Sequence, residues 1–225
     1  MTLSVAARCE RTGQFGVIIA SSSPAVAARC AYVRAGIGAA CTQNITDPRL
    51  GPVLLDLMAS GRTAQEAVSA VVGSEALIAY RQLTAIDVSG VTGSHSGEGT
   101  LGIHATAYGA NVVATGNLLA NDEVPKAMVQ AFGTNTDDDL GDRLLAALSA
   151  GIDAGGEAGP VHSAGLLIAG EASWPITDLR VDWHDDPIAE LALVWYVWKP
   201  QVAGYLQRAL NPGNAPSYGV PGDFR

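Results

Sequence analysis

The sequence predicts an α+β fold in which β-sheets and α-helices stack as separate layers. Two observations predict it. The chain opens directly with two short apolar segments of strand type, and its helical segments come in adjacent pairs with strands between the pairs. Alternating strand–helix–strand units would instead place single helices between strands. A layered sandwich therefore fits the order of the elements better.

The opening segment, Thr2–Arg8, alternates along its length and is predicted to be a strand. Turn-forming residues at Glu10–Gly13 separate it from a second, more apolar strand, Phe15–Ala20. We expect these two strands to form a hairpin. A third strand, made of small residues, is predicted at Gly36–Cys41.

A pair of helices is predicted next. The first covers about Gly51–Ala59 and is terminated by Gly61, a residue that favours helix C-termini. The second begins at Thr63, and Glu66 three residues later gives the spacing of a capping box. Its apolar residues recur at helical spacing, at Ala67, Val68, Val71 and Val72.

The rest of the chain continues with strands, a second helical pair, more strands and a final helix. Gly- and Ser-rich residues up to Gly97 are predicted to be a turn, and residues 151–159 a flexible link. Acidic residues begin the helix at 137–150, where the helix dipole favours them. Strands are predicted at 82–88, 102–107, 111–114, 164–169 and 177–183, and helices at 124–132, 137–150 and 187 to about 210.

One domain over residues 1–225 is expected. Hydrophobic residues make up 48% of the chain, enough for a sizeable core, and no internal repeat or Pro- or Ser-rich linker divides it. Residues 211–225 are rich in Pro and Gly and are predicted to be a C-terminal tail packed on the surface.

Composition narrows the classes of partner. The net charge of −9 and the lack of clustered Lys and Arg argue against nucleic acid. No apolar stretch reaches about 18 residues, so no membrane span is expected. Charged residues are only 16%, which suggests covered surface and a homo-oligomer. Three cysteines, an odd number, without a secretion signal favour the reducing cytoplasm.

No cofactor or metal is expected from sequence motifs. The segment Gly36-Ile37-Gly38 lacks the third Gly and the strand-to-helix context of a dinucleotide fingerprint. A Gly-Lys-Ser/Thr phosphate loop and a Gly-x-Ser-x-Gly nucleophile motif are both absent. So are the Cys-x-x-Cys and His-Glu-x-x-His spacings of metal sites.

Thr2 is the first candidate for catalysis. Removal of the initiator Met, which is common before a small residue, would leave Thr2 with a free α-amine beside its hydroxyl. That amine, with an ordinary pKa of about 8, can take the hydroxyl proton and activate a weak nucleophile. A strand begins at once, so we expect the terminus to be held in the sheet. The alternative is an ordinary Met-Thr start, and a retained Met1 would leave Thr2 without its base.

Polar residues at two strand ends are the next candidates. Ser21, Ser22 and Ser23 follow the second strand, whose end lies near Thr2 in a hairpin. One hydroxyl, with Ser21 the candidate, can orient the Thr2 amine; a polar turn is the alternative. The amide of Asn117 can donate to a developing oxyanion, which is worth about 3 kcal/mol where measured. A turn or helix-cap Asn is the alternative there.

The densest run of ionisable residues is 178–186. On a strand, alternate side chains share one face. A structural charge network at the sheet edge is favoured over a catalytic or metal site. Its members are Asp178, Arg180, Asp182 and His184, with Asp186 following.

Several stretches, in order along nearly the whole chain, resemble the family called domain of unknown function 1028. They are Thr2–Arg8 with Thr12-Gly13, residues 34–39 running into Thr42-Gln43, Gly51-Pro52 with residues 55–57, residues 116–119, and residues 178–187. That family is regarded as Ntn-hydrolase-like, a four-layer αββα sandwich of two stacked sheets between layers of helices. The resemblance therefore implies this fold for residues 1–225.

The resemblance also implies roles for residues. In the general N-terminal-nucleophile scheme, Thr2 is the nucleophile, its own amine the base, and Asn117 an oxyanion donor. Arg34 is expected where Thr-type members keep a Lys that tunes the amine, and its role would be electrostatic because Arg stays protonated. The segment Val161-His162-Ser163 departs from the Gln-Ser pair expected there. Ser22, Ser23, Gln43 and Asn44 are expected to line the substrate site.

The predicted function is an amide hydrolase acting on a small linear or cyclic amide or a short peptide, through an acyl ester on Thr2. Two alternatives stay open. One is a non-catalytic binding or assembly protein of the same fold, which a retained Met1 would favour. The other is a metal-dependent hydrolase centred on Asp178, Asp182, His184 and Asp186.

Overall fold

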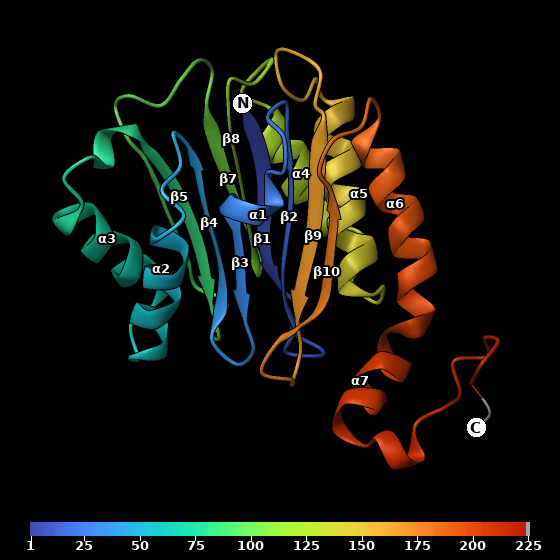
Figure 1. Cartoon of the computed structure of the whole chain (residues 1–225). Coiled ribbons are helices and arrows are strands. Elements are labelled where there is room, and N and C mark those ends of the chain that lie inside the picture. The colour runs from blue at the N-terminus through green and yellow to red at the C-terminus, as the bar shows by residue number, and fades with distance from the viewer. Residues whose placement is uncertain (224–225) are drawn as a thin grey trace.

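The computed structural model describes residues 1–223 and places their strands in two antiparallel sheets that face each other between helices (Figure 1). The first sheet has the order β10-β9-β2-β1-β8-β7, and the second the order β3-β4-β5-β6. The strands are β1 (Thr2–Arg8), β2 (Phe15–Ser21), β3 (Ala31–Arg34), β4 (Gly38–Asn44), β5 (Arg81–Asp87), β6 (Thr92–Ser96), β7 (Ala105–Gly109), β8 (Val112–Asn117), β9 (Ser163–Ala169) and β10 (Pro175–Val181). The helices are α1 (Ala27–Cys30), α2 (Leu50–Ala59), α3 (Ala64–Ser74), α4 (Val124–Phe132), α5 (Leu140–Asp153), α6 (Pro187–Trp198) and α7 (Val202–Leu210).

Three apolar layers hold the sandwich together. One lies between the first sheet and helices α4, α5 and α6, and a second lies between the two sheets. The third lies between the second sheet and helices α2 and α3. Figure 1 shows the same order from left to right: helices, sheet, sheet, helices. The predicted four-layer αββα sandwich is therefore confirmed.

Strand β1 lies in the interior of the first sheet and is buried on both faces. Its odd-numbered residues, such as Leu3 and Val5, pack in the layer toward α4 and α5. Its even-numbered residues include Ala6, which packs in the layer between the sheets. Because successive side chains of a strand point to opposite faces, Thr2 and Ser4 share the face of Ala6. The Thr2 side chain is thereby directed into the space between the two sheets.

The first pair of helices, α2 and α3, lies between β4 and β5 and agrees with the sequence prediction. Helix α3 begins after Thr63, and both halves of the capping box form. The Glu66 amide donates to the Thr63 hydroxyl at 3.2 Å, and the Thr63 amide donates to the Glu66 carboxylate at 2.8 Å. These bonds satisfy amides at the helix start that otherwise lack partners. Helix α4 also has the predicted bounds of residues 124–132.

The Gly- and Ser-rich segment before Gly97 contains a strand, and the predicted turn is wrong for residues 92–96. Residues 92–96 form β6, which pairs with β5 along its length. A Cβ on Gly93 would lie 2.6 Å from the Ala64 carbonyl oxygen, so α3 packs directly on the backbone of this strand. Small residues are required by that close approach and hide the strand signal. The elements α1 and β3, before β4, were also not predicted.

The C-terminal helical region is broken where one continuous helix was predicted. Pro200 lies in a 3-10 turn, Lys199–Gln201, between α6 and α7. Proline cannot donate its backbone nitrogen and clashes with the preceding turn, which explains the break. Residues 211–223 then fold back on α7, where Arg208 donates to the Pro216 and Ser217 carbonyls and stacks over Tyr218. The last two residues of the predicted tail, 224–225, lie outside the described residues.

The predicted flexible link at 151–159 is also wrong for much of its length. Helix α5 continues to Asp153, so residues 151–153 are helical. Beyond it, Glu157 is buried and forms a bridge with Leu119.

Among residues 1–223, no helix combines the length and apolarity needed to cross a bilayer.

The apolar layer between α2 and the second sheet should be sensitive to truncation of its buried side chains. Leu54 has no solvent exposure, whereas its neighbour Val53 is exposed. We expect Leu54→Ala to lower the free energy of unfolding by about 2–5 kcal/mol, because it removes buried methyl groups and leaves a cavity. Val53→Ala should change it by less than about 1 kcal/mol. Urea unfolding of both variants checks this, and equal losses would contradict the assigned packing.

Candidate active site

Four neighbouring strands of the first sheet end side by side at the chain terminus. Thr2 begins β1 and pairs with Asn117, the last residue of β8. Ser21 ends β2 and pairs with Ser163, the first residue of β9. The Thr2 hydroxyl lies 3.4 Å from the Ser21 hydroxyl. We call these four side chains the polar row; each is at most 5% exposed. Antiparallel pairing thus gathers one amide and three hydroxyls at one edge.

A chain of buried amides links this edge to the second sheet. The Ser4 hydroxyl donates to Gln43 Oε1 at 2.7 Å, and Gln43 Nε2 donates to Gln82 Oε1 at 2.8 Å. Gln82 Nε2 donates to the Gly116 carbonyl at 3.0 Å, and Asn117 Nδ2 donates to Gln82 Oε1 at 3.0 Å. Each residue here except Gly116 lies on a strand face turned toward the opposite sheet. The apolar layer between the sheets therefore becomes polar where it approaches Thr2.

This chain of bonds fixes how the Asn117 amide is oriented. A carbonyl only accepts, so the Gly116 carbonyl requires the nitrogen of Gln82, and Gln82 must turn its oxygen to Asn117. Asn117 therefore presents its nitrogen to Gln82 and keeps Oδ1 for another partner. That oxygen is buried and has no hydrogen bond within the described chain. The atom left free is thus an acceptor.

The turn after Asn117 is strained. Leu118 has a φ of 52°, in the left-handed region that a branched side chain rarely adopts, at a cost of about 1–3 kcal/mol. Its amide donates to the Leu101 carbonyl at 3.0 Å, and its carbonyl accepts from the Ala158 amide at 2.9 Å. Contacts from two separate loops therefore hold this turn and fix the direction in which β8 ends.

Met1 covers Thr2 in this structure. The hydroxyls of Thr2 and Ser21 both donate to the Met1 carbonyl. The Met1 side chain approaches Gly159, where an added Cβ would lie 3.4 Å from Met1 Cε. With Met1 present, the Thr2 nitrogen is part of a peptide bond and the two hydroxyls share one carbonyl oxygen.

Glu157 is a carboxyl beside this terminus that sequence reasoning missed. It is 6% exposed, its Oε2 accepts from the Ser22 amide at 3.2 Å, and its Oε1 is buried without a partner among residues 1–223. Burial raises the pKa of Glu157 to about 7, although the positive chain terminus and the hydrogen bonds from Ser22 oppose that rise. A titratable acid thus lies next to the polar row.

Ser22, Ser23 and Asn44 make contacts that stabilise the rim of this edge. The Ser23 amide donates to Ser21 Oγ at 3.0 Å, and the Ser23 carbonyl accepts from Ser163 Oγ at 2.6 Å. Asn44 donates to the Tyr80 carbonyl at 2.7 Å and accepts from the Leu101 amide. The Ser22 amide donates to Glu157, whereas Gln43 is enclosed in the amide chain. Their predicted role in substrate binding stays a prediction.

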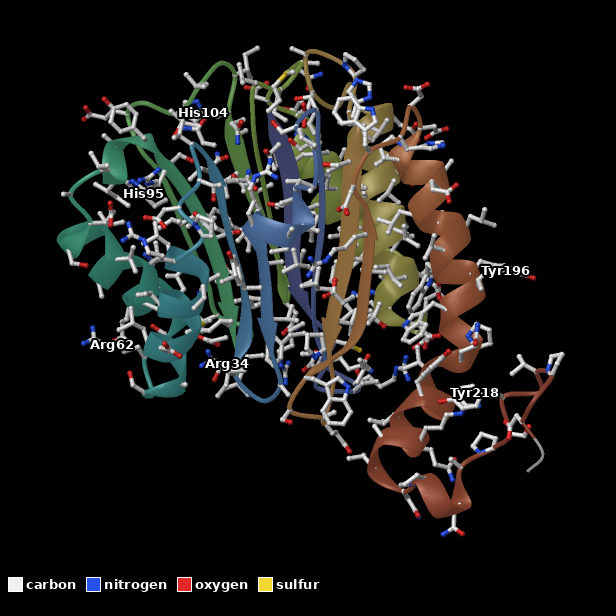
Figure 2. The ribbon with its side chains drawn as sticks, viewed as in Figure 1. Arg34, Arg62, His95, His104, Tyr196 and Tyr218 are labelled. Carbon is white, nitrogen blue, oxygen red and sulfur yellow. The ribbon has the colours of Figure 1, made fainter. Side chains whose placement is uncertain are left out.

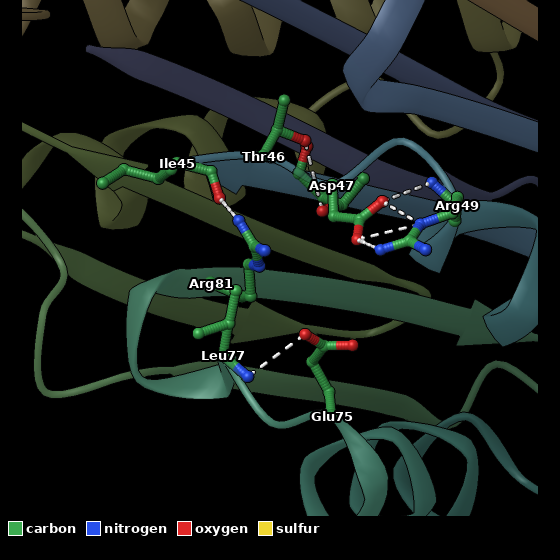
Figure 3. Close-up of polar contacts among 8 residues, drawn as sticks. Ile45, Thr46, Asp47, Arg49, Glu75, Leu77 and Arg81 are labelled. Atoms are coloured by element: carbon green, nitrogen blue, oxygen red, sulfur yellow. Dashed lines mark hydrogen bonds and ion pairs between the residues drawn. The ribbon is translucent and has the colours of Figure 1, made fainter.

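The loop after Asn44 is held by an ion pair at the same end of the second sheet (Figure 3). Asp47 accepts from the Arg49 side chain and from its backbone amide. The hydrogen bonds and charge of Arg49, against the opposing effect of burial, lower the pKa of Asp47 to about 2. Arg81 adds a bond of 2.6 Å to the Ile45 carbonyl. This loop is therefore anchored to β5.

Arg34 is not brought to Thr2, and the role expected for it is not supported. Arg34 pairs with Gly38 at the start of β4, whereas the other end of β4, at Asn44, lies beside the polar row. Figure 2 places Arg34 at the end of the sandwich away from the N-terminus marked in Figure 1. Its guanidinium pairs with Asp56 of α2 at 2.8 Å. A side chain next to the β3–β4 turn cannot reach the opposite end of the strands.

The side chains of Asp178, Arg180, His184 and Asp186 form short-range contacts within the stretch 178–189. Arg180 binds Asp178 through two bonds of 2.7 and 2.8 Å, as neighbours on one strand face. His184 Nδ1 accepts from the Asp186 amide, and Asp186 caps α6 by accepting from the Ala189 amide. Asp182 lies beyond the end of β10 and accepts from Ala25 through its backbone carbonyl. Within residues 1–223, no three His, Cys, Asp or Glu side chains are grouped to hold a metal ion.

Gln82 is a residue of the site that was not predicted, although the sequence carries a signal for it. Gln82 and Thr84 are polar residues inside a strand, β5, that is buried along its whole length. Buried polar side chains need partners, so they indicate a polar network between sheets. Ser163 carried no such signal, because its partners Ser23 and Val26 are far away in the sequence.

Comparison with known proteins identifies relatives without a known activity. The profile of the "Family of unknown function (DUF1028)" matches residues 2–191. Protein SPO2555 from Silicibacter pomeroyi, whose crystal structure is assigned to DUF1028, is 28% identical with a TM-score of 0.83, over 92% of this chain and 94% of its own. None of the curated proteins matches.

Two bacterial proteins called Anbu give weaker structural likenesses. Anbu (ancestral beta-subunit) from Yersinia bercovieri is 12% identical with a TM-score of 0.36, over 91% of this chain and 97% of its own. Anbu from Hyphomicrobium sp. strain MC1 is 11% identical with a TM-score of 0.38, over 97% of this chain and 100% of its own. Likenesses at this level carry no conclusion about activity.

The amide chain can be tested by removing its central member. Gln82→Met keeps a similar length but removes the partner that Gln82 supplies to Gln43 Nε2, Asn117 Nδ2 and the Gly116 carbonyl. We expect the free energy of unfolding to fall by roughly 3–9 kcal/mol, at about 1–3 kcal/mol for each unsatisfied group. Gln65→Met, at an exposed position of α3, is the matched control. If both substitutions cost the same, the amide chain is not what stabilises this edge.

The raised pKa of Glu157 predicts a pH-dependent stability. The usual value is 4.5 and the folded value about 7, so the protonated acid contributes stability that is fully present below pH 4.5 and is lost as pH rises through 7. Glu157→Gln keeps a neutral side chain at every pH. The free energy of unfolding of Glu157→Gln, relative to that of the wild type, should therefore rise by up to about 3 kcal/mol from low pH to about pH 8.5.

Urea unfolding at both pH values measures this difference. The exposed Glu98→Gln serves as the control for loss of one negative charge. A gap between Glu157→Gln and the wild type that stays constant with pH would contradict the burial of this carboxyl.

Proposed function

The chain belongs to the family of unknown function DUF1028, and we propose that it is an N-terminal-nucleophile hydrolase acting on a small amide or short peptide. The observation that carries this proposal is the position of Thr2. Its hydroxyl is held at the sheet edge beside the Ser21 hydroxyl, in the first residue of a strand paired on both sides. A nucleophile on that residue is preorganised by the sheet.

Catalysis begins after Met1 is removed. The Thr2 α-amine then takes the proton of the Thr2 hydroxyl while Oγ1 attacks the substrate carbonyl carbon. The resulting ammonium gives its proton to the leaving nitrogen as the carbon–nitrogen bond breaks, which leaves an acyl ester on Thr2. Water, deprotonated by the same amine, attacks that ester, and the acid product leaves as the hydroxyl recovers its proton.

The neighbours of Thr2 support the amine in this proposal. Removal of Met1 takes away the carbonyl that both hydroxyls bind, so Ser21 becomes available to orient the amine. Asn117 Oδ1 is the unpartnered acceptor on the paired strand and is suited to accept an amine N–H. Oxyanion donation by Asn117 would use the hydrogen of Nδ2 that Gln82 does not take. Glu157 supplies a nearby carboxyl as counter-ion to the protonated amine.

The bound Met1 carbonyl favours a second candidate function. If Met1 is retained, its carbonyl satisfies both hydroxyls and Thr2 has no free amine. The protein would then be a binding or assembly module of the same fold. Intact mass of native protein distinguishes the two: loss of one methionine residue supports the hydrolase, and the full-length mass supports the module.

We also propose that the protein is a homo-oligomer and that it resides in the reducing cytoplasm. Helix α6 leaves Leu193, Tyr196 and Val197 exposed, and Tyr196 projects from it in Figure 2. Cys9, Cys30 and Cys41 are free thiols. Sedimentation velocity measures the oligomeric state, and a monomer at micromolar concentration would exclude the oligomer.

Thr2→Ala should lower the rate of hydrolysis of small amides and short peptides by at least about 1,000-fold, because it removes the nucleophile. Thr2→Ser keeps a hydroxyl and should retain measurable activity. Thr12→Ala, at an exposed turn residue, should match the wild type. Release of free amine from each substrate is the measurement. Equal rates for Thr2→Ala and the wild type would remove Thr2 from the reaction.

A further inference from the structure

A cavity of about 440 Å³ lies at the end of the first sheet opposite Thr2. Its walls come from the last residues of β1, the β1–β2 turn, the β7–β8 turn and the facing ends of α4 and α5. This volume falls within the range of about 300–1,000 Å³ that is typical of small-molecule sites. The cavity is separate from the polar row by the full length of β1.

Three arginines line this cavity: Arg8, Arg11 and Arg143. The chain has only 13 basic residues and a net charge of −9, so three of them at one cavity are a local excess of positive charge. Glu10 and Asp137 also line it. Within residues 1–223, however, none of the three guanidinium groups forms an ion pair with a carboxylate; the ion pairs found lie elsewhere.

Arg143 is the most firmly placed of the three. It is 8% exposed, and its Nε and Nη2 donate to the Phe132 carbonyl at 3.2 and 3.0 Å. Its guanidinium lies 3.9 Å from the centre of the Phe132 ring. Burial lowers the pKa of Arg143, against the opposing effects of Cys9 and of the Asp138 charge, which reflects the cost of holding this charge away from water.

Arg8 and Arg11 are held by neutral oxygens. Arg8 Nη1 donates to Asn111 Oδ1 at 3.1 Å, and Arg8 Nε is buried without a partner. Arg11 Nη2 donates to the Asp137 and Asp138 carbonyls at 3.2 and 3.5 Å. Neutral partners orient a guanidinium but leave its charge uncompensated. Each arginine is thus oriented by neutral oxygens and not by a direct ion pair.

We propose that this cavity binds a small organic anion through a carboxylate or phosphate group. Guanidinium groups bind both groups with paired, charge-assisted hydrogen bonds. The unpartnered Nε of Arg8 shows that the protein does not satisfy every donor of this guanidinium. A large polyanion is disfavoured, because the rest of the chain is acidic and would repel it.

Isothermal titration with inorganic phosphate and with malonate, at constant ionic strength, tests this proposal on the full-length protein. We expect at least one probe to bind the wild type with one site per chain. Binding of phosphate alone identifies a phosphate ligand, and binding of malonate alone a carboxylate ligand. Constant ionic strength separates specific binding from general screening.

Charge-neutral variants locate the site. Arg8→Gln and Arg11→Gln should each weaken binding by at least about tenfold, since each removes a charged donor. Arg62→Gln loses the same charge at an exposed position beside α2 and should bind like the wild type (Figure 2). Arg143→Lys keeps the charge but loses the bonds to Phe132; circular dichroism and thermal unfolding establish whether it is folded before it is titrated.

Two results would overturn the proposal. One is the absence of heat and of thermal stabilisation with both probes in the folded wild type. The other is equal weakening by Arg62→Gln and by the two cavity variants. Thr2→Ala should bind the probes unchanged, so this outcome is independent of the hydrolase proposal.

Discussion

The backbone ladder that pairs β1 with β2 on one side and β8 on the other is the interaction on which the structure of the site depends. Chain termini usually fray, because few contacts hold them. Here the second residue is already paired with Asn117 of β8, the third is paired with both neighbouring strands, and the Thr2 side chain is buried. The same pairing sets which faces the side chains take, so a slip of one residue would turn Thr2 toward α4 and α5.

The polar layer near Thr2 is costly, and its organisation explains how it is tolerated. Most of the space between the sheets is filled by apolar side chains such as Phe15, Val17 and Ile86. Toward the terminus these give way to amides and hydroxyls that are almost fully hydrogen-bonded. Two buried acceptors in this region, on Asn117 and Glu157, keep an unsatisfied oxygen. Unsatisfied buried oxygens are uncommon in folded proteins, and two beside one terminus suit a site that receives an amine.

The two ends of β1 differ in charge. At the Thr2 end the ionisable neighbour is the acid Glu157, and at the Arg8 end three guanidinium groups surround a cavity. Between these ends the strand is apolar apart from Ser4. We therefore propose a cation as the species bound at one end and an anion as the species bound at the other.

Local signals in the sequence were sufficient for much of the fold. The capping box at Thr63, the bounds of α4 and the opening hairpin follow from residues close together in the chain, and hairpin geometry correctly brings Ser21 to Thr2. Contacts between distant segments were not predictable in this way. The strand β6 is hidden because Gly93 must admit the backbone of α3. Glu157 reaches the terminus only through the packing of a glycine-rich loop, and Arg34 was placed by resemblance without a geometric constraint.

Treatment of the native protein with a small strained lactone, followed by mass mapping of its peptides, tests the catalytic role of Thr2 most directly. A lactone acylates an activated hydroxyl and leaves an ester that marks the residue. We predict a single acyl ester on Thr2, at the start of a first peptide that lacks Met1. An unmodified first peptide that still carries Met1, or an ester on Ser21 with Thr2 unreacted, would contradict this role.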